Sequence, residues 1–277
     1  MNNEKQLKLE KLEIRLFLEA IYEYYGYDFR HYSSTYLGRR IRKSIEDEKV
    51  DTISTLQSLI LHDTSSMFRF LENLSVNVTE MFRDPEIFRI LRTVVFPELT
   101  NLGHIKIWHA GCASGEEVYS TAILLLEENL LDKTRIYATD ISETLIEKGK
   151  SGIFPLKSMK AYTANYMASG GQCSFSKYYM AKYDHAIFKT NLKQNILWAI
   201  HNLASDRSFN EFQLVFCRNV MIYFDTFLQE SVHKLIYESL CVGGFLILGS
   251  KESISFSPYE NCYEELDAKV KIYRKIK

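Results

Sequence analysis

The chain has 277 residues, of which 46% are hydrophobic and 25% are charged, as in globular proteins that bury a core. The formal net charge of -1 argues against a chain-wide attraction to nucleic acid or to an anionic membrane. The charged N-terminus lacks the apolar segment of a secretory signal, and no apolar run reaches the ~20 residues of a membrane-spanning helix. Five cysteines without a CxxC pair favour a reducing cytoplasm over a disulfide framework or a zinc site.

The first 74 residues predict a compact helical domain. Apolar residues recur at helical spacing at Leu9, Leu12, Leu16, Ala20 and Tyr24, with charged residues on the other face of this predicted helix. A second helix is expected to begin after Ser33 or Ser34, and to turn Leu37 and Ile41 inward. Further helices are expected near Thr52–Leu61 and Ser65–Leu74.

Beyond Ile105, predicted strands alternate with predicted helices. The strands are Ile105–Ala110, Arg135–Thr139, Ile196–Ile200, Phe212–Cys217 and Phe245–Leu248, and the helices are Glu116–Glu128, Glu143–Lys150 and Thr226–Leu240. This alternation indicates right-handed crossovers and a mainly parallel sheet, so the fold class is α/β. The last segment, Val270–Arg274, is a candidate edge strand.

Residues 152–193 interrupt this alternation with a proline, a Gly-Gly pair and five tyrosines. They predict an inserted subdomain whose secondary structure the pattern does not define. The predicted organisation is therefore a helical domain over residues 1–75 and an α/β domain over residues 76–277, with an insertion at about 152–193.

A glycine-containing loop, His109-Ala-Gly-Cys-Ala-Ser-Gly-Glu-Glu117, follows the first predicted strand. Glycines let such a loop approach a ligand closely at the start of a helix, although the loop can also be a purely structural turn. Asp140 ends the next strand, where an acid can accept both ribose hydroxyls of a nucleoside or can cap the following helix. The GxxxG spacing, the lack of a nearby Lys or Arg, and the paired acids Glu116 and Glu117 disfavour the pyrophosphate of NAD. The paired acids suit the ammonium and sulfonium groups of S-adenosylmethionine.

Two further segments contribute polar side chains. Arg218, Asn219 and Tyr223 follow the fourth strand, and the absence of proline there disfavours the motif of nucleobase amino-methyltransferases. Alternatively, Tyr223 and Phe224 are core residues at a helix start. The segment SVNVTEMFRD joins the two predicted domains, and its Arg83 can clamp a carboxylate or pair with a neighbouring acid, Asp84 or Glu80.

Six segments resemble, in the same order, the motifs of the CheR-type glutamate methyltransferases of bacterial chemotaxis: NVTEMFRDPEIF, IWHAGCASGEEVYS, YATDIS, HNL, FCRNVMIYFD and GGFLILGSKES. They extend from about Asn77 to Ser253. The resemblance implies a Rossmann-like methyltransferase domain and a small helical domain. It implies S-adenosylmethionine as cofactor, S-adenosylhomocysteine as product, and methyl transfer to glutamate carboxylates in a helical cytoplasmic region of a receptor.

The resemblance also implies roles for individual residues. Arg83 and Tyr223 would meet the incoming carboxylate as catalytic residues. The cofactor would be bound by Asn77, Thr79, Arg83, Gly111, Glu117 (with Glu116 as second choice), Asp140, Asn202, Leu203, Arg218 and Asn219. The basic helix would dock the protein substrate through Arg39, Arg40, Arg42 and Lys43, unless these residues form a solvated helix face. No metal, no nucleic-acid partner and no membrane insertion is expected.

The sequence departs from the family pattern at two places. His109 stands where many S-adenosylmethionine enzymes have an acid, and the tyrosine-rich insertion shows no match to the β-ribbon that grips a receptor tail in some members. Tail tethering and chemotaxis as the pathway therefore stay open.

A glutamate carboxylate has a reference pKa near ~4.3 and is ionised at neutral pH, so the expected reaction needs no general base. Arg83 and Tyr223 would orient the carboxylate. The competing interpretations are a non-catalytic adaptor that binds S-adenosylmethionine and a NAD-dependent oxidoreductase.

Overall fold

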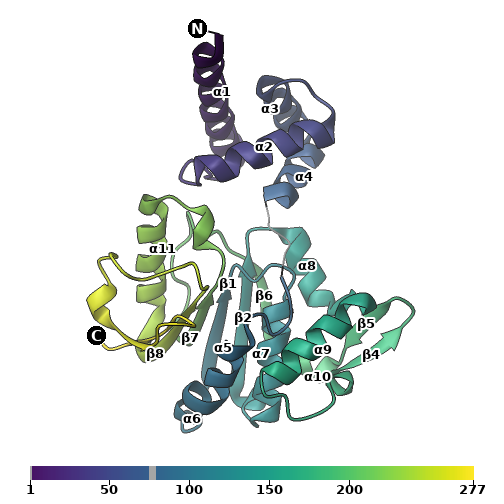
Figure 1. Cartoon of the computed structure of the whole chain (residues 1–277), viewed down its shortest axis with the longest axis vertical. Helices are drawn as coiled ribbons and strands as arrows, with labels where there is room; N and C mark the ends of the chain where they lie inside the picture. Colours follow the sequence, from purple (N-terminus) through teal and green to yellow (C-terminus); the bar gives the residue numbers. More distant parts are fainter. Residues whose placement is uncertain (1, 75–78) are drawn as a thin grey trace. The chain divides into compact units, whose positions relative to one another are not determined.

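A computed structural model describes residues 2–74 and 79–277, which divide into two compact units (Figure 1). One unit comprises Met1–Val76 with Tyr223–Ser231, and the other comprises Asn77–Ile222 with Val232–Lys277. Each unit is described by itself below. None of the helices in the described ranges is both long enough and apolar enough to span a membrane.

The helical unit contains the four predicted helices. They are α1 (Asn2–Tyr25), α2 (Ser34–Glu48), α3 (Ile53–His62) and α4 (Thr64–Leu74). Helix α3 begins where the Thr52 side chain accepts a hydrogen bond from the Thr55 N–H. The predicted inward residues of α2, Leu37 and Ile41, are buried. The chain returns to this unit at Tyr223–Ser231, where Phe224 forms an isolated antiparallel bridge with Tyr32.

The buried face of α1 differs from the face that its leucine spacing indicated. Phe17 and Ile21 are 0% and 1% exposed, whereas Leu9 and Leu16 are 54% and 50% exposed. The prediction that the leucine face of α1 is the buried face was therefore wrong. The reason is that α1 carries apolar residues on two faces, and the face with the aromatic Phe17 packs on the ring of Phe70.

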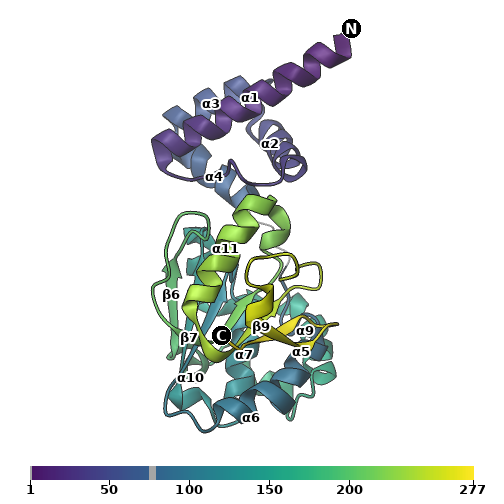
Figure 2. The ribbon, with the colours of Figure 1, turned by 90° about the vertical axis from the view of Figure 1, so that its left-hand side faces the viewer.

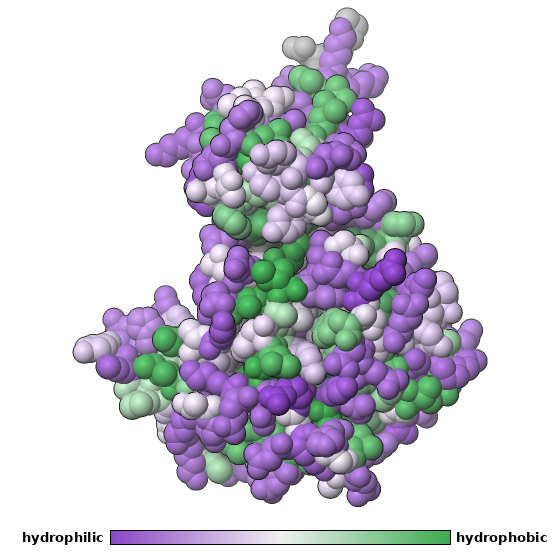
Figure 3. Space-filling view, turned by 180° about the vertical axis from the view of Figure 1, so that it is seen from behind, coloured by the Kyte–Doolittle hydropathy of each residue, from purple (hydrophilic) through white to green (hydrophobic). Residues whose placement is uncertain are grey.

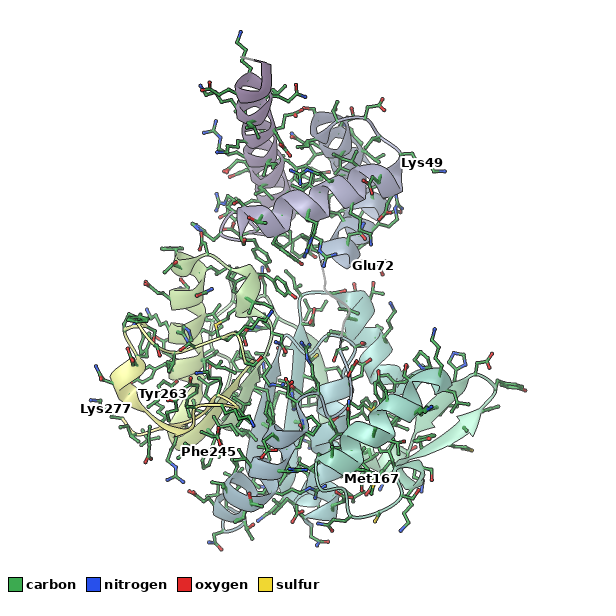
Figure 4. All side chains as sticks on the ribbon, in the orientation of Figure 1. Lys49, Glu72, Met167, Phe245, Tyr263 and Lys277 are labelled. Carbon is green, nitrogen blue, oxygen red and sulfur yellow. The ribbon has the colours of Figure 1, made fainter. Side chains whose placement is uncertain are left out.

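The α/β unit is built on one seven-stranded sheet in the order β6-β2-β1-β7-β8-β10-β9. The strands are β1 (Ile105–Ala110), β2 (Thr134–Asp140), β6 (Ile196–Ile200), β7 (Phe212–Cys217), β8 (Leu240–Leu248), β9 (Tyr263–Asp267) and β10 (Ile272–Lys275). The pairs among β6, β2, β1, β7 and β8 are all parallel, which confirms the predicted mainly parallel sheet. Strand β10 pairs antiparallel with β8 and with β9, so the predicted last strand is internal and β9 forms the edge. Figure 4 labels Phe245 on β8 and Tyr263 on β9.

Helices connect these strands and cover the sheet (Figure 1). They are α5 (Pro85–Ile90), a π-helical turn (Leu91–Val95), α6 (Phe96–Leu99), α7 (Glu116–Glu127), α8 (Glu143–Ser151) and α11 (Thr226–Ser239). Short 3₁₀ turns occur at Leu131–Lys133, Met221–Tyr223 and Glu260–Cys262. Strand β1 is buried along most of its length, as expected for a strand with neighbours on both sides and helices on its faces.

The insertion folds as a small subdomain. A three-stranded antiparallel sheet in the order β3-β5-β4 is formed by β3 (Ile153–Pro155), β4 (Tyr179–Lys182) and β5 (His185–Phe188). Its helical parts are α9 (Met159–Ala168), α10 (Thr190–Lys193) and 3₁₀ turns at Leu156–Ser158 and Phe175–Tyr178. The Tyr166 and Tyr178 hydroxyls both donate to the carboxylate of Glu127, at the end of α7. Two of the tyrosines that marked the insertion thus attach it to the α/β unit.

Candidate functional site

Four predicted site segments follow the carboxyl ends of neighbouring parallel strands. Gly111 follows β1, Asp140 ends β2, Asn202 follows β6 and Arg218 follows β7. Ala110 is paired with Thr139 and Asp140 with Ile200, so these ends lie at one edge of the sheet. Ligands of open α/β sheets bind at this edge. The structure therefore brings these residues together where the sequence placed them.

The loop after β1 uses its glycines as expected. Gly111 and Gly115 adopt φ values of +73° and +89°, in the left-handed region that glycine tolerates best. A Cβ atom at Gly115 would lie 2.5 Å from the ring of Trp198, so the loop could not keep this path with a larger residue. Ala113 also has a positive φ of 47°, and its N–H donates to Asp140 Oδ2 at 2.9 Å.

Asp140 ties this loop to the end of β2. Its Oδ1 accepts from the N–H of Ser142, and burial raises its pKa although these backbone donors oppose the rise. Ser142 itself caps α8, because its side chain accepts from the Leu145 N–H. The Ile141 N–H is a third backbone donor to this carboxylate. A carboxylate has about four acceptor positions, so Asp140 keeps capacity for a hydroxyl of a bound molecule.

A buried ion-pair network lies beside the loop. Arg218 Nη1 donates to Glu117 Oε2 at 2.5 Å, and Arg218 also pairs with Asp84. Glu117 Oε1 lies 3.0 Å from His109 Nδ1. Burial favours the neutral form of Glu117, but the Arg218 guanidinium and His109 overcome it and lower the pKa to about 2. His109, which stands where an acid was expected, thus supports the Glu117 carboxylate.

Two nitrogens of this network are buried and have no hydrogen-bond partner within the part of the chain that the structure describes. They are His109 Nε2 and Arg218 Nε. Buried polar atoms are nearly always paired in folded proteins, so two such atoms at one sheet edge are typical of a place where a bound molecule completes the bonding.

Glu116, the alternative to Glu117, has a different environment. It is 7% exposed and accepts a hydrogen bond from the Ser114 hydroxyl at 2.8 Å. Burial raises its pKa to about 7, and the Ser114 hydrogen bond opposes that rise. The two adjacent acids at the start of α7 therefore have opposite shifts in pKa.

Arg83 lies in a strained segment of the α/β unit. The residues on both sides of it, Phe82 and Asp84, have left-handed φ values of 54° and 57°. Such backbone is costly for residues other than glycine, and it occurs preferentially at functional sites. The Phe82 N–H donates to Ser120 Oγ on α7 at 2.9 Å, which fixes the segment. Asp84 pairs with Arg218, which links this segment to the ion-pair network.

Four other predicted cofactor residues come from the segment that precedes Arg83 and from the turn after β6. Thr79 is half-buried, and Asn77 lies outside the described residues. Asn202 is held in a turn after β6, where its Oδ1 accepts from the Ala204 N–H and its own N–H donates to Asp206. Leu203, which follows it, is half-buried.

Glu252 is a residue of the site edge that the sequence analysis did not single out. Its two carboxylate oxygens accept four backbone N–H groups at 2.6–2.8 Å, from Asn219, Val220, Met221 and Gly249. Burial raises its pKa, and these donors oppose that rise. Asn219 has a positive φ of 60°, so Glu252 holds the chain after Arg218 in an unusual turn. The motif GSKES contained this acid, but only the fold shows that it reaches the loop after β7.

Tyr223 belongs to the helical unit, whereas Arg83 belongs to the α/β unit. Its ring centroid is 4.5 Å from that of Tyr36, and its carbonyl accepts from the Ser33 N–H at 2.8 Å. Tyr223 is half-buried and its neighbour Phe224 is buried. Of the two aromatic residues Tyr223 and Phe224, only Phe224 is thus a core residue.

The basic residues of α2 do not form one uniform face. Arg39, Arg42 and Lys43 are exposed, whereas Arg40 is half-buried. The Arg40 guanidinium lies 5.2 Å from the centroid of the Tyr36 ring. Arg42 forms an ion pair with Glu10 of α1.

Two thiols lie next to the site residues, Cys112 in the loop and Cys217 at the end of β7. Both are buried, and burial raises both pKa values well above the ordinary thiol range. In the ranges that the structure describes, no group of three or more His, Cys, Asp or Glu side chains is placed to hold a metal ion.

A mainly parallel sheet, a glycine loop after β1 and an acid with free acceptor positions at the end of β2 define a class, the S-adenosylmethionine-dependent methyltransferases. Two family profiles match the chain, "CheR methyltransferase, all-alpha domain" over residues 12–75 and "CheR methyltransferase, SAM binding domain" over residues 77–270. The chain belongs to the CheR methyltransferase family, and S-adenosylmethionine is its cofactor.

Curated relatives agree with this family. The chain is 48% identical over 264 residues to a protein of Pseudomonas putida named "Putative methyltransferase Cher3", covering 95% of this chain and 97% of that one. It is 30% identical over 237 residues to "Chemotaxis protein methyltransferase 1" of Vibrio cholerae, covering 80% and 82%. It is 27% identical over 231 residues to a "Chemotaxis protein methyltransferase" of Listeria innocua, covering 83% and 85%.

Proposed function

We propose that this methyltransferase acts on glutamate side chains of a helical signalling protein, a chemoreceptor or a chemoreceptor-like protein, in the cytoplasm, and forms methyl esters. Family membership and the names of the Vibrio and Listeria relatives support this substrate class. The observation that carries the proposal is the strained segment that holds Arg83 between two left-handed residues, beside the ion-pair network. An arginine whose backbone is held in this way suits an incoming carboxylate, because its guanidinium can bind both carboxylate oxygens.

The charge state of the site suits a nucleophile that needs no deprotonation. The reaction needs no general base, so we assign His109 to the support of the Glu117 carboxylate through Nδ1. A substrate glutamate is ionised at neutral pH and can attack without losing a proton. The work left to the enzyme is to place the carboxylate oxygen in line and to exclude water.

The proposed step is a direct displacement. The bound cofactor supplies an electrophilic methyl group on a sulfonium. A substrate carboxylate oxygen forms the new bond to the methyl carbon while the carbon–sulfur bond breaks and its electron pair stays on sulfur. Arg83 gathers the carboxylate by charge, and the Tyr223 hydroxyl orients the reacting oxygen. No proton moves, so the ester forms without an acid or a base.

The cofactor would be held by the residues at the sheet edge. We assign Asp140 to the ribose hydroxyls, because it ends β2 at the carboxyl edge of the sheet and its carboxylate keeps acceptor capacity beyond its backbone donors. Glu117 and Arg218, with Gly111, would lie along the methionine part, and Asn202 and Leu203 beside the adenine. Asn77, Thr79, Arg83 and Asn219 complete the proposed set.

The protein substrate would dock on the exposed basic residues of α2. Reversing the charges of Arg39 and Arg42 should raise KM for an acidic helical substrate, while cofactor affinity stays unchanged. Salt should have the same effect, because exposed charges are screened over about 10 Å at 0.1 M. Lys150→Glu, an exposed reversal on α8 in the other unit, serves as the control. Salt-independent kinetics with a silent double variant would return these residues to a solvated face.

The decisive experiment is transfer of a radiolabelled methyl group to a glutamate-bearing helical receptor fragment, with alkali-labile release of methanol as the sign of an ester. Tyr223→Phe should lower kcat about 10- to 100-fold with cofactor Kd nearly unchanged, which is the effect of one well-placed hydrogen bond. Arg83→Ala should lower kcat further, because it leaves the substrate charge uncompensated. Cofactor binding without transfer to any candidate protein would favour the adaptor instead.

A further inference from the structure

Helix α1 carries a row of leucines on its outer face. Leu9, Leu12 and Leu16 are 54%, 42% and 50% exposed, although the opposite face of the same helix is buried in the helical unit. Figure 2 shows the N-terminal turns of α1 running past the other helices of this unit, and Figure 3 shows hydrophobic side chains on its surface near the N-terminal end. Three exposed leucines on one helical face exceed the scattered apolar residues of an ordinary surface.

The spacing of this face is that of a coiled-coil seam. Lys5, Leu9, Leu12, Leu16, Glu19 and Glu23 follow one another at alternating intervals of four and three residues. This is the alternation of a and d positions in a heptad repeat. The seam is apolar in its middle, basic at its N-terminal end and acidic at its C-terminal end.

The order of the charged residues along this face of α1 distinguishes a parallel from an antiparallel pair of α1 helices. In a parallel pair of α1 helices, each charged seam position would face its own copy, so that Lys5 and Glu23 would each meet a like charge. Glu19 contributes less to this repulsion, because it already forms an ion pair with Arg30. In an antiparallel pair, positions related about residue 14 would meet. Leu12 would then pack on Leu16 of the other copy, Glu19 would flank Leu9, and Lys5 would face Glu23. Opposite charges across such a seam set orientation as well as partner choice.

We propose that α1 is a self-association surface, through which two copies of this chain pair as antiparallel helices about residue 14. The contact is isologous, because the same seam contributes to both sides. It is also small, since only three leucines of each copy form its apolar centre. Stable interfaces usually bury about 1,200–2,000 Å² in total, so the dimer should be weak and should depend on protein concentration. The inference does not rest on the proposed substrate.

Sedimentation velocity of the full chain from about 1 µM to about 200 µM tests the proposal, because a micromolar Kd changes the populations over this range. The wild type should shift from monomer to dimer. Leu12→Glu with Leu16→Glu should remain monomeric throughout, and Leu102→Glu, at an exposed leucine of the other unit, should behave as wild type. Circular dichroism should be unchanged in all of them, because these side chains are exposed.

A charge exchange tests the orientation. Lys5→Glu alone and Glu23→Lys alone should each weaken the dimer several-fold, whereas the two changes in one chain should restore it. A monomer at every concentration, or a dimer indifferent to the leucine changes, would overturn the self-association surface. Failure of the double exchange to restore the dimer would overturn the antiparallel register. A monomer whose Leu12 and Leu16 variants lose binding to a helical substrate would assign the face to that substrate and overturn the proposal.

Discussion

The two ends of α7 carry glutamates that are held by different sets of partners. At the C-terminal end, Glu127 accepts from the Tyr166 and Tyr178 hydroxyls and pairs with Arg92. At the N-terminal end, Glu117 is held by Arg218 and His109. Each network leaves a buried nitrogen without a partner among the described residues, at Arg92 Nε in the first and at His109 Nε2 and Arg218 Nε in the second.

The place of each network in the fold separates a structural carboxylate from one at a binding site. Glu127 lies at the unfavourable end of the helix dipole, and the protein supplies it with a cation and two hydroxyls. Arg92 also forms an ion pair with Glu128, so the π-helical turn, α7 and the insertion are joined at this end. Glu117 lies at the favourable end of the dipole, beside the loops that follow β1 and β7. Burial, charge and an unpaired nitrogen therefore do not identify a site by themselves, whereas their place at the carboxyl edge of the parallel strands does.

The largest expected effect is on the free energy of unfolding, and it should distinguish Glu127 from Glu117 at the two ends of α7. Glu127→Gln should lower the free energy of unfolding by about 3 kcal/mol, because the buried Arg92 would lose one of its two carboxylate partners. The affinity for S-adenosylhomocysteine should stay within about twofold, which is a difference of about 0.4 kcal/mol. Urea unfolding and calorimetry measure the two quantities on the same samples. A loss of affinity equal to that in Glu117→Gln would contradict the comparison.

The pH dependence of stability should show opposite slopes for the adjacent acids of α7. The pKa of Glu116 is raised from 4.5 to about 7, so its protonated form is favoured in the folded state and stability should rise as pH falls from 7 to 4.5. The pKa of Glu117 is lowered from 4.5 to about 2, so its stabilisation is complete above pH 4.5 and is lost as pH falls toward 2. Each shift corresponds to about 3 kcal/mol.

Urea unfolding of the wild type, Glu116→Gln and Glu117→Gln from pH 8 to pH 2.5 resolves these contributions. Glu116→Gln should lose the rise between pH 7 and 4.5, and Glu117→Gln should lose part of the fall below pH 4.5. Difference curves that are flat in both windows would refute the assigned pKa shifts.

A third effect is expected in binding. Asp140→Ala should weaken binding of S-adenosylmethionine by about 2–3 kcal/mol, the scale of hydrogen bonds to a charged acceptor. Asp140→Asn keeps the size of the side chain but replaces one of the two acceptor oxygens with an amide nitrogen. A similar loss of affinity in this variant would show that the carboxylate oxygens are what bind the cofactor. Isothermal calorimetry measures both variants. Unchanged affinity in Asp140→Ala would remove this acid from the cofactor site.

The smallest expected effect is on stability, at the C-terminal end of α7. Tyr178→Phe removes one of the hydroxyls that serve Glu127 and should cost about 1 kcal/mol of stability without changing activity. Tyr183→Phe, at an 86% exposed tyrosine of the same insertion, is the matched control and should be silent. Equal unfolding midpoints for the two variants would show that the Tyr178 hydrogen bond does not hold the insertion.

The sequence predicted the parts of this fold that repeat a simple pattern. The strands Ile105–Ala110 and Phe212–Cys217 were correct because buried parallel strands are continuous apolar runs, and their sheet edge followed from the alternation with helices. Strand β9 was not predicted, because Tyr263-Glu-Glu-Leu-Asp267 is mostly polar, as an edge strand can be. The inner face of α1 was misjudged because both of its faces carry apolar residues.

At the candidate site, single residues could be chosen from their motifs but their partners could not. Pairing of Arg218 with Asp84 and Glu117 joins three segments far apart in the chain, and no local pattern relates them. Glu252 shows the same limit, since its donors lie on two loops that only the sheet brings together. The roles of Arg83 and Tyr223 stay predictions until the kinetic variants are measured.

The burial of Cys112 and Cys217 has a consequence for redox chemistry. Oxidants and alkylating reagents react with thiolates, and these two thiols stay protonated and shielded. The half-buried Cys173 and Cys262 are therefore the first to form sulfenic acid or to accept a maleimide, ahead of Cys241, whose pKa is also raised by burial. Mild oxidation would modify Cys173 and Cys262 first and leave the thiols beside Gly111 and Arg218 reduced.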